Sequence, residues 1–289
     1  MKFLCSVVAV FMLAAGVSNG QTVFCIGNSL SNDYEPFNLD DSQFHIYCSR
    51  NLQYIFDNPL GHCVNASDPW TEVLPVNQYE YLIVQPFAGT TLEQDVDVIS
   101  QWYQMQLNIG AAPAVVIHSS WTAWGTFPEI FQDGVSHCTP EYRQALRQSL
   151  EVEFPGIEVL FTRSSDMLFE IHQDGFDLRT TMGRDFIHID LDHGREMMNQ
   201  LVRYTIGQPV TMMVTEADTS EMNEYLTGVL RQMVIPGDTN FDTEVDLLDL
   251  QGFIDALING DNLPSADVNK DGRVDLIDID PFVQLIVGG

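Results

Sequence analysis

The sequence predicts a three-layer α/β domain followed by a small all-helical domain. Between residues 22 and 205, apolar runs of strand length alternate with segments of helical periodicity, which is typical of a mainly parallel sheet covered by helices. Two copies of one acidic loop pattern then occur within residues 237–289, and each is followed by an apolar helical segment. The length of 289 residues and the 45% hydrophobic content allow a sizeable buried core.

The first 20 residues predict a secretory signal peptide. They contain one lysine, an apolar run and then small residues up to Gly20, so we expect cleavage before Gln21. No later stretch approaches the roughly 18 apolar residues of a membrane helix, so no membrane insertion is expected. The formal net charge of -29 argues against nucleic acid and anionic membrane surfaces as partners.

Five strands and four helices are expected from the periodicity. Residues 44–49 are the weakest of the strands. Thr139 and Pro140 mark a helix start, because threonine caps helices and proline fits their first turn. The expected strands are residues 22–27, 44–49, 80–87, 112–121 and 156–162, and the expected helices are residues 91–108, 139–153, 193–205 and 219–233.

The first strand ends at a serine. Ser29 would lie at the start of a helix, where free backbone N–H groups meet the sheet edge, and this is a suitable place for a nucleophile. The alternative is that Ser29 or Ser31 simply caps the helix. Gln85 and Gly89 lie at the end of another expected strand, and His118 lies at the end of a further one. Because the carboxyl ends of parallel strands meet at one sheet edge, we expect these residues to line a common site.

A late loop carries an aspartate and a histidine. Asp185 precedes His188 by three residues just before a helix, so the loop can aim the imidazole at a serine while the carboxylate holds its other nitrogen. Asp190 and His193 have the same spacing and give a second reading. We expect His118 to be a wall of the pocket rather than the base.

Four cysteines remain after Cys5 leaves with the signal peptide. Three pairings are open, of which Cys48 with Cys63 is the easiest local closure. Cys25 lies in an apolar strand, where a buried free thiol is at least as good an interpretation, and Cys138 is the fourth.

The two acidic loops predict calcium sites. Calcium takes about six to eight oxygen ligands, which alternate residues of a tight loop can supply. Across residues 237–289 there are 12 acidic and 2 basic side chains, so this region should be marginally stable until metal binds. We expect two structural ions, held by Asp238, Asn240, Asp242, Glu244 (through its carbonyl), Asp246 and Asp249, and by Asp267, Asn269, Asp271, Arg273 (through its carbonyl), Asp275 and Asp278.

These loops resemble a type I dockerin over residues 237–289. Dockerins are paired calcium-loop modules that attach extracellular enzymes to cohesin domains. The resemblance implies calcium as a structural ion, a cohesin-like protein as partner, and a bacterial protein that is secreted or lies at the cell surface.

The segments GNSLSND at 27–33 and DFIHIDLDHG at 185–194 resemble the first and last blocks of the SGNH or GDSL hydrolase superfamily. The resemblance implies a flavodoxin-like fold and no catalytic cofactor. It also implies that Ser29 is the nucleophile, His188 the base and Asp185 the residue that orients His188.

The middle blocks of that family match less well. Its second-block glycine and the asparagine of its GxND block, both oxyanion donors, are absent in that form. Ser49 and Gln85 are the candidates for these two positions. The sequence then divides into a signal peptide (1–20), an SGNH-like domain (21–210), a helical extension or linker (211–236) and a dockerin-like domain (237–289).

The function predicted from these features is that of a secreted serine esterase. Its expected substrate is an ester, with acyl groups such as acetyl on a glycan as the favoured case. Two alternatives stay open: a catalytically inactive carbohydrate-binding or structural module displayed by the dockerin, and an attachment protein driven by the dockerin alone. Trp121 and Trp124 fit either stacking on a sugar or packing in the core.

Overall fold

The structure of the chain is a computed structural model. It describes residues 23–210, 221–233, 236–239, 245–259, 264–266, 268 and 274–288. The predicted signal peptide lies outside the described residues. Seven of the expected calcium ligands also lie outside them: Asn240, Asp242, Glu244, Asp267, Asn269, Asp271 and Arg273.

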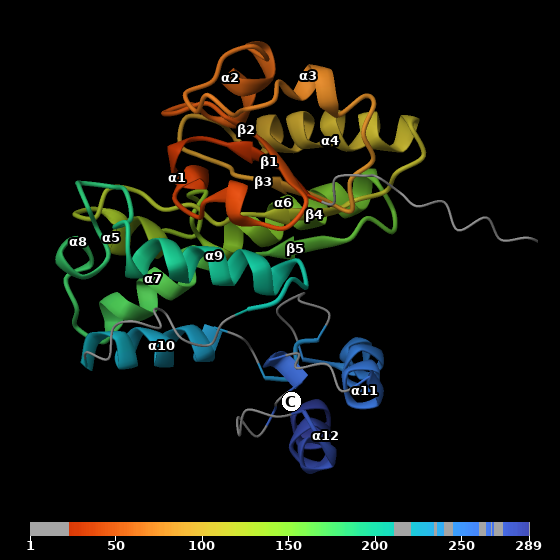
Figure 1. Cartoon of the computed structure of the whole chain (residues 1–289), viewed down its shortest axis with the longest axis vertical. Helices are drawn as coiled ribbons and strands as arrows, with labels where there is room; N and C mark the ends of the chain where they lie inside the picture. The colour runs from red at the N-terminus through yellow and green to blue at the C-terminus, as the bar shows by residue number, and fades with distance from the viewer. Residues whose placement is uncertain are drawn as a thin grey trace, which may run out of the picture.

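A five-stranded parallel sheet forms the centre of the α/β domain, in the order β2-β1-β3-β4-β5 (Figure 1). This strand order is that of flavodoxin-like folds, so the predicted fold class is confirmed. Three strands end three or four residues earlier than predicted, since β2 stops at Ile46, β3 before Gln85 and β4 before His118, and the residues that follow leave the sheet. The strands are β1 (Val23–Gly27), β2 (Ser42–Ile46), β3 (Tyr81–Val84), β4 (Ala114–Ile117) and β5 (Val159–Phe161).

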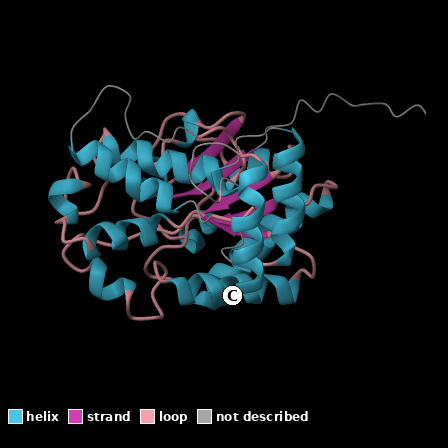
Figure 2. Ribbon diagram, turned by 90° about the horizontal axis from the view of Figure 1, so that it is seen from below, coloured by secondary structure: helices cyan, strands magenta, loops and turns pink. Residues whose placement is uncertain are grey.

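Helices cover both faces of the sheet, as Figures 1 and 2 show. Alternate strand residues point to opposite faces, so Phe24 packs in one apolar cluster and Cys25 in the other. One face is covered by α2 (Leu52–Asp57), α3 (Trp70–Val73), α4 (Leu92–Asn108) and α6 (Pro140–Glu153). The other is covered by α1 (Ser29–Asn32), α5 (Phe127–Phe131), α7 (Ser164–Gln173), α8 (Leu178–Thr181), α9 (His193–Thr205) and α10 (Glu221–Met233), and a short 3-10 turn, η1, spans Pro36–Asn38.

Helix α10 packs on the α/β domain. Its side chains Leu226, Val229, Leu230 and Met233 are buried in the same cluster as residues of α7 and α9. The described part of the predicted extension therefore adds to the core and is not a spacer.

The C-terminal region repeats one structural unit. In each copy a 3-10 turn leads directly into a helix, and the rings of Phe253 and Phe282 stack with centroids 4.0 Å apart at the centre of a small apolar cluster. The elements are η2 (Leu247–Asp249) with α11 (Leu250–Asn259) and η4 (Leu276–Asp278) with α12 (Ile279–Gly288), joined through η3 (Pro264–Ala266).

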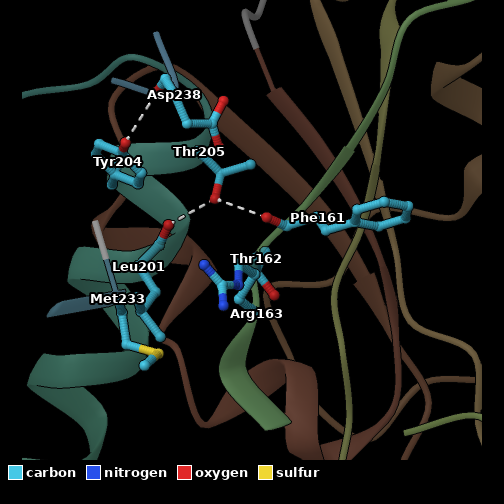
Figure 3. A pocket seen from close by; sticks show the side chains of 8 residues that line it. All are labelled: Phe161, Thr162, Arg163, Leu201, Tyr204, Thr205, Met233 and Asp238. Carbon is cyan, nitrogen blue, oxygen red and sulfur yellow. Dashed lines mark hydrogen bonds between the residues drawn. The ribbon is translucent and has the colours of Figure 1, made fainter. Parts of the chain in front are cut away.

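Helix α9 joins the C-terminal region to the α/β domain (Figure 3). The buried Tyr204 hydroxyl donates to the carbonyl of Asp238 at 3.3 Å, and the Thr205 hydroxyl donates to the carbonyl of Phe161 at 3.4 Å. Burial raises the pKa of Tyr204 well above its ordinary value, so this hydroxyl stays a neutral donor. Side chains of Arg163 and Met233 line the same small pocket.

Cys48 and Cys63 form a disulfide, which is the local closure favoured by the sequence. Cys25 and Cys138 are buried free thiols, and burial raises the pKa of each to about 12. No helix in the described part of the chain is long and apolar enough to cross a bilayer.

Candidate active site

Ser29, His188 and Asp185 form one hydrogen-bonded row, although the serine lies 159 residues before the histidine. The Ser29 Oγ is 2.9 Å from His188 Nε2. On the other side of the ring, His188 Nδ1 is 2.8 Å from Asp185 Oδ2. An imidazole held between a carboxylate and a hydroxyl can take up the hydroxyl proton while the carboxylate stabilises the resulting charge.

The turn between β1 and α1 leaves the Ser29 hydroxyl free for this contact. Asn28, and not Ser29, is the helix cap, since its side-chain oxygen accepts the N–H of Leu30 at 2.9 Å. Ser31 donates its hydroxyl to Gln85 Oε1. Gly27 is required at the end of the strand, because a Cβ there would overlap the Ser31 hydroxyl.

The late loop holds Asp185 in its ionised form. Its Oδ1 accepts the backbone N–H groups of Ile187 at 2.9 Å and His188 at 2.8 Å. Desolvation alone would raise the pKa of Asp185, but these N–H groups and the His188 ring outweigh it and lower the pKa to about 2. The carboxylate therefore stays charged throughout the neutral and mildly acidic range.

Asp33 links α1 to the late loop. Its side chain is fully buried, accepts the N–H of Ile189 at 3.1 Å, and lies 3.2 Å from the Arg184 guanidinium and 3.8 Å from that of Arg195. Desolvation raises its pKa to about 6, against the lowering effects of His188, the Ile189 N–H and both arginines. The sequence suggests only that Asp33 caps or orients the first helix, because its partners lie more than 150 residues away.

We expect Asp33 to make stability depend on pH. Its folded pKa of about 6 exceeds the ordinary value of 3.8, so the folded state holds this proton more tightly, and the stability that the proton contributes is lost as pH rises from about 4 to 6. The loss should be on the order of 3 kcal/mol. Urea unfolding at pH 4 and pH 7 measures this loss. The free energy of unfolding should depend on pH with a smaller slope in Asp33→Asn than in the wild type, and the exposed Asp97→Asn variant should keep the wild-type slope. Equal slopes in all three proteins would contradict the assignment.

The second Asp–His reading places its residues differently. Asp190 Oδ1 accepts the backbone N–H groups of Asp192 at 3.0 Å and Gly194 at 2.9 Å, so it organises the start of α9, which begins at His193. His118 is fully buried, lies 3.0 Å from the Thr162 hydroxyl, and has a pKa lowered to about 3 by desolvation. The geometry thus brings His188 to Ser29, while His118 is buried against Thr162.

The two oxyanion candidates differ in what the structure offers. Gln85 Oε1 accepts the backbone N–H groups of Asn28 at 3.1 Å and Ser31 at 3.0 Å, while its Nε2 is buried without a hydrogen-bond partner in the described part of the chain. Gln85 therefore holds the turn that carries Ser29 through its oxygen, and its enclosed amide nitrogen does not match the predicted donor role. Ser49 is exposed and has a φ of 59°, a left-handed conformation that favours glycine.

Trp121 and Trp124 are buried with stacked rings, 6.2 Å apart, so the core interpretation holds rather than an exposed sugar platform. Trp124 also borders an open groove of about 590 Å³ between α5, α7 and α8. Phe176 and Arg179 lie on its walls.

The described ends of both acidic loops share one geometry. Asp249 Oδ2 accepts the N–H of Asp246 at 2.9 Å, and Asp278 Oδ2 accepts the N–H of Asp275 at the same distance. Asp249 Oδ1 also accepts the N–H of Thr239 at 2.7 Å, which ties the end of the first loop to its beginning next to Asp238. The all-oxygen donor set fits a hard cation such as calcium. Within the described residues alone, no three acidic, histidine or cysteine side chains gather closely enough to hold a metal.

Comparisons with known proteins match one part of the chain by sequence. Residues 236–281 match the family model described as Dockerin type I domain. No curated protein sequence matches the chain. Among solved structures, a DUF4886 family protein from Bacteroides uniformis ATCC 8492 aligns with a TM-score of 0.46 and 15% identity over 74% of this chain and 94% of that one.

A protein from Parabacteroides merdae ATCC 43184, described as a GDSL-like lipase, aligns with a TM-score of 0.41 and 12% identity over 65% of this chain and 96% of that one. The chain therefore combines a five-stranded parallel α/β domain with a C-terminal region that matches the dockerin type I family.

Proposed function

We propose that this protein is a serine hydrolase that cleaves esters at Ser29. The observation that supports it best is the continuous row from the Ser29 hydroxyl through the His188 ring to the Asp185 carboxylate, with contacts of 2.9 and 2.8 Å. These are the distances expected of a nucleophile, its base and the group that orients the base.

In the proposed reaction, Ser29 Oγ attacks the ester carbonyl as its proton passes to His188 Nε2. Asp185 stabilises the imidazolium, and the tetrahedral intermediate collapses when His188 returns the proton to the leaving alcohol. Water then attacks the acyl-enzyme with His188 again as the base, which releases the acid. The backbone N–H of Ser29 has no acceptor within its helix and can donate to the developing oxyanion.

The proposed substrate is an acylated glycan, such as an acetylated polysaccharide. Its support is contextual, since the dockerin match fits an extracellular protein assembled with others. The groove beside Trp124 offers room for sugar units, and Trp124 also donates to the carbonyl of Asp185. The proposed domains are the SGNH-like domain with α10 packed on it and the dockerin-like region from residue 237, held by two calcium ions.

The C-terminal surface is the proposed binding site for a cohesin-like protein. The two repeats expose equivalent pairs of apolar side chains, Leu247 with Leu248 and Leu276 with Ile277, each between 66% and 78% exposed. Side chains this apolar and this exposed at matching positions favour a protein interface.

A binding module without catalysis is the second candidate. The enclosed Nε2 of Gln85 favours it, because no side-chain donor then replaces the asparagine of the GxND block. Such a module would bind acylated glycans without turning them over.

Replacing His188 and His193 in turn tests which of these two histidines is the base. We expect the purified full-length protein to hydrolyse p-nitrophenyl acetate, and His188→Ala to lower kcat by at least about 10³-fold, because it removes the base. His193→Ala, from the same segment, should stay within a few-fold of the wild type. No hydrolysis of short-chain esters by the wild type, or a loss confined to His193→Ala, would overturn the proposal.

A further inference from the structure

Two stacked indoles contact the loop that carries Asp185 and His188. Trp121 and Trp124 come from the segment between β4 and α5, and their rings are nearly parallel at 10°. Trp121 is fully buried and Trp124 is 5% exposed. Both side chains pack in the apolar cluster beneath α9, so their positions are set by the core of the domain.

Both indole N–H groups donate to backbone carbonyls of that loop. Trp124 Nε1 donates to the carbonyl of Asp185 at 2.9 Å, and Trp121 Nε1 donates to the carbonyl of Ile187 at 2.6 Å. The backbone N–H of Trp124 donates to the intervening carbonyl of Phe186 at 3.0 Å. Three successive carbonyls of the loop are thus held by one short segment.

The loop approaches the indoles as closely as it can. A Cβ on Gly183, at the start of the loop, would overlap Trp124 Nε1 and would lie 3.0 Å from the carbonyl of Arg179. Glycine at this position allows the loop backbone to lie directly against the ring. A larger residue would push the loop away from it.

A second set of contacts joins the loop to the end of α1. Asp33, the C-cap of α1, accepts the N–H of Ile189 and pairs with Arg184, and α1 also carries Ser29. The loop is therefore held by a carboxylate at the end of the nucleophile helix and by two indoles. A shift of the loop changes the distance between His188 Nε2 and Ser29 Oγ.

We infer that Trp121 and Trp124 are positioning residues, which hold the Asp185–His188 loop at the distance from Ser29 that proton transfer requires. The inference rests on the proposed function for its effect on rate, and on the loop geometry alone for its effect on structure. Neither indole contacts the reacting atoms, so their contribution is alignment of the histidine.

The test replaces each indole by a ring without the donor. We expect Trp121→Phe and Trp124→Phe to lower kcat for p-nitrophenyl acetate by roughly 10- to 100-fold with KM changed less than about 2-fold, because the misaligned base affects the reaction step and not binding. Trp70→Phe is the matched control, since Trp70 Nε1 donates to the carbonyl of Ile55 at 3.3 Å in the other apolar cluster. It should lower the melting temperature similarly and leave kcat unchanged.

A second readout does not depend on turnover. The Nδ1 proton between His188 and Asp185 should give a downfield NMR resonance, assigned by its absence from His188→Ala. We expect it to shift or to exchange faster in both tryptophan variants, and to stay unchanged in Trp70→Phe. Gly183→Ala provides a variant that leaves both indoles intact and should show the same change, because it displaces the loop from the ring.

The outcomes separate this inference from the proposed function. An inactive wild type whose His188 resonance responds to the tryptophan variants would refute the esterase and keep the positioning role. An active wild type with kcat and the resonance unchanged in Trp121→Phe, Trp124→Phe and Gly183→Ala would refute the positioning role. Equal losses of kcat in these variants and in Trp70→Phe would also refute it, because they would reflect general destabilisation.

Discussion

Ser29→Ala is expected to lower kcat for ester hydrolysis by about 10³- to 10⁶-fold and to abolish labelling by a fluorophosphonate probe. The variant removes the oxygen that lies 2.9 Å from His188 Nε2, so neither the acyl-enzyme nor the phosphonylated adduct can form. The fold should be retained, because Asn28 caps α1 and Gln85 holds the turn through the Asn28 and Ser31 backbones. Steady-state kinetics and mass spectrometry of the labelled protein measure both effects.

The control for this experiment is a serine on the other face of the sheet. Ser149 lies on α6 and donates its hydroxyl to the carbonyl of Ala145 at 2.9 Å, so Ser149→Ala should label and turn over like the wild type. Labelling of Ser29→Ala at the wild-type rate would show that another residue is the nucleophile. Strong binding of an acetylated glycan by a wild type that neither labels nor hydrolyses would favour the binding module.

Calcium removal should produce the largest effect on stability. With 12 acidic and 2 basic side chains in residues 237–289, the C-terminal region repels itself unless a cation neutralises its loops. At a free calcium concentration 1,000 times the Kd, each site should contribute about 4 kcal/mol. We expect chelation by EDTA to lower the unfolding temperature of this region in the full-length protein by calorimetry, and added calcium to restore it.

Two variants make the calcium test specific. Asp238→Ala should remove much of the increase in unfolding temperature that calcium causes. Asp238 is the first residue of the first acidic loop and precedes Thr239, whose N–H donates to Asp249. Asp255→Asn should retain the full response, because Asp255 is exposed on α11 and accepts from Gln251 at 2.9 Å. Identical melting curves with calcium and with EDTA would contradict the two-ion proposal and leave the hydrolase proposal untouched.

Periodicity and residue spacing were enough to predict the α/β class, the five strands and four of the helices within a few residues, and the repeated C-terminal loops. They did not predict α2, α3, α5, α7 and α8. These features are local, because each depends on side chains within a few residues of one another. The candidate residues Ser29, Asp185 and His188 also followed from short motifs at strand and helix ends. The parallel sheet accounts for the position of Ser29 at the end of β1. The loop of Asp185 and His188 follows α8 and not a strand, so its meeting with Ser29 was decided by the tertiary structure.

Tertiary structure alone decided how the site is supported. Gln85 holds the serine turn through its oxygen, Asp33 pairs with Arg184 of the late loop, and the two indoles donate to carbonyls of that loop. Each contact joins segments separated by 57 to 151 residues. Such contacts leave no periodic trace in a single sequence, because a hydrogen bond depends on the directions of two side chains that only the packed core brings together.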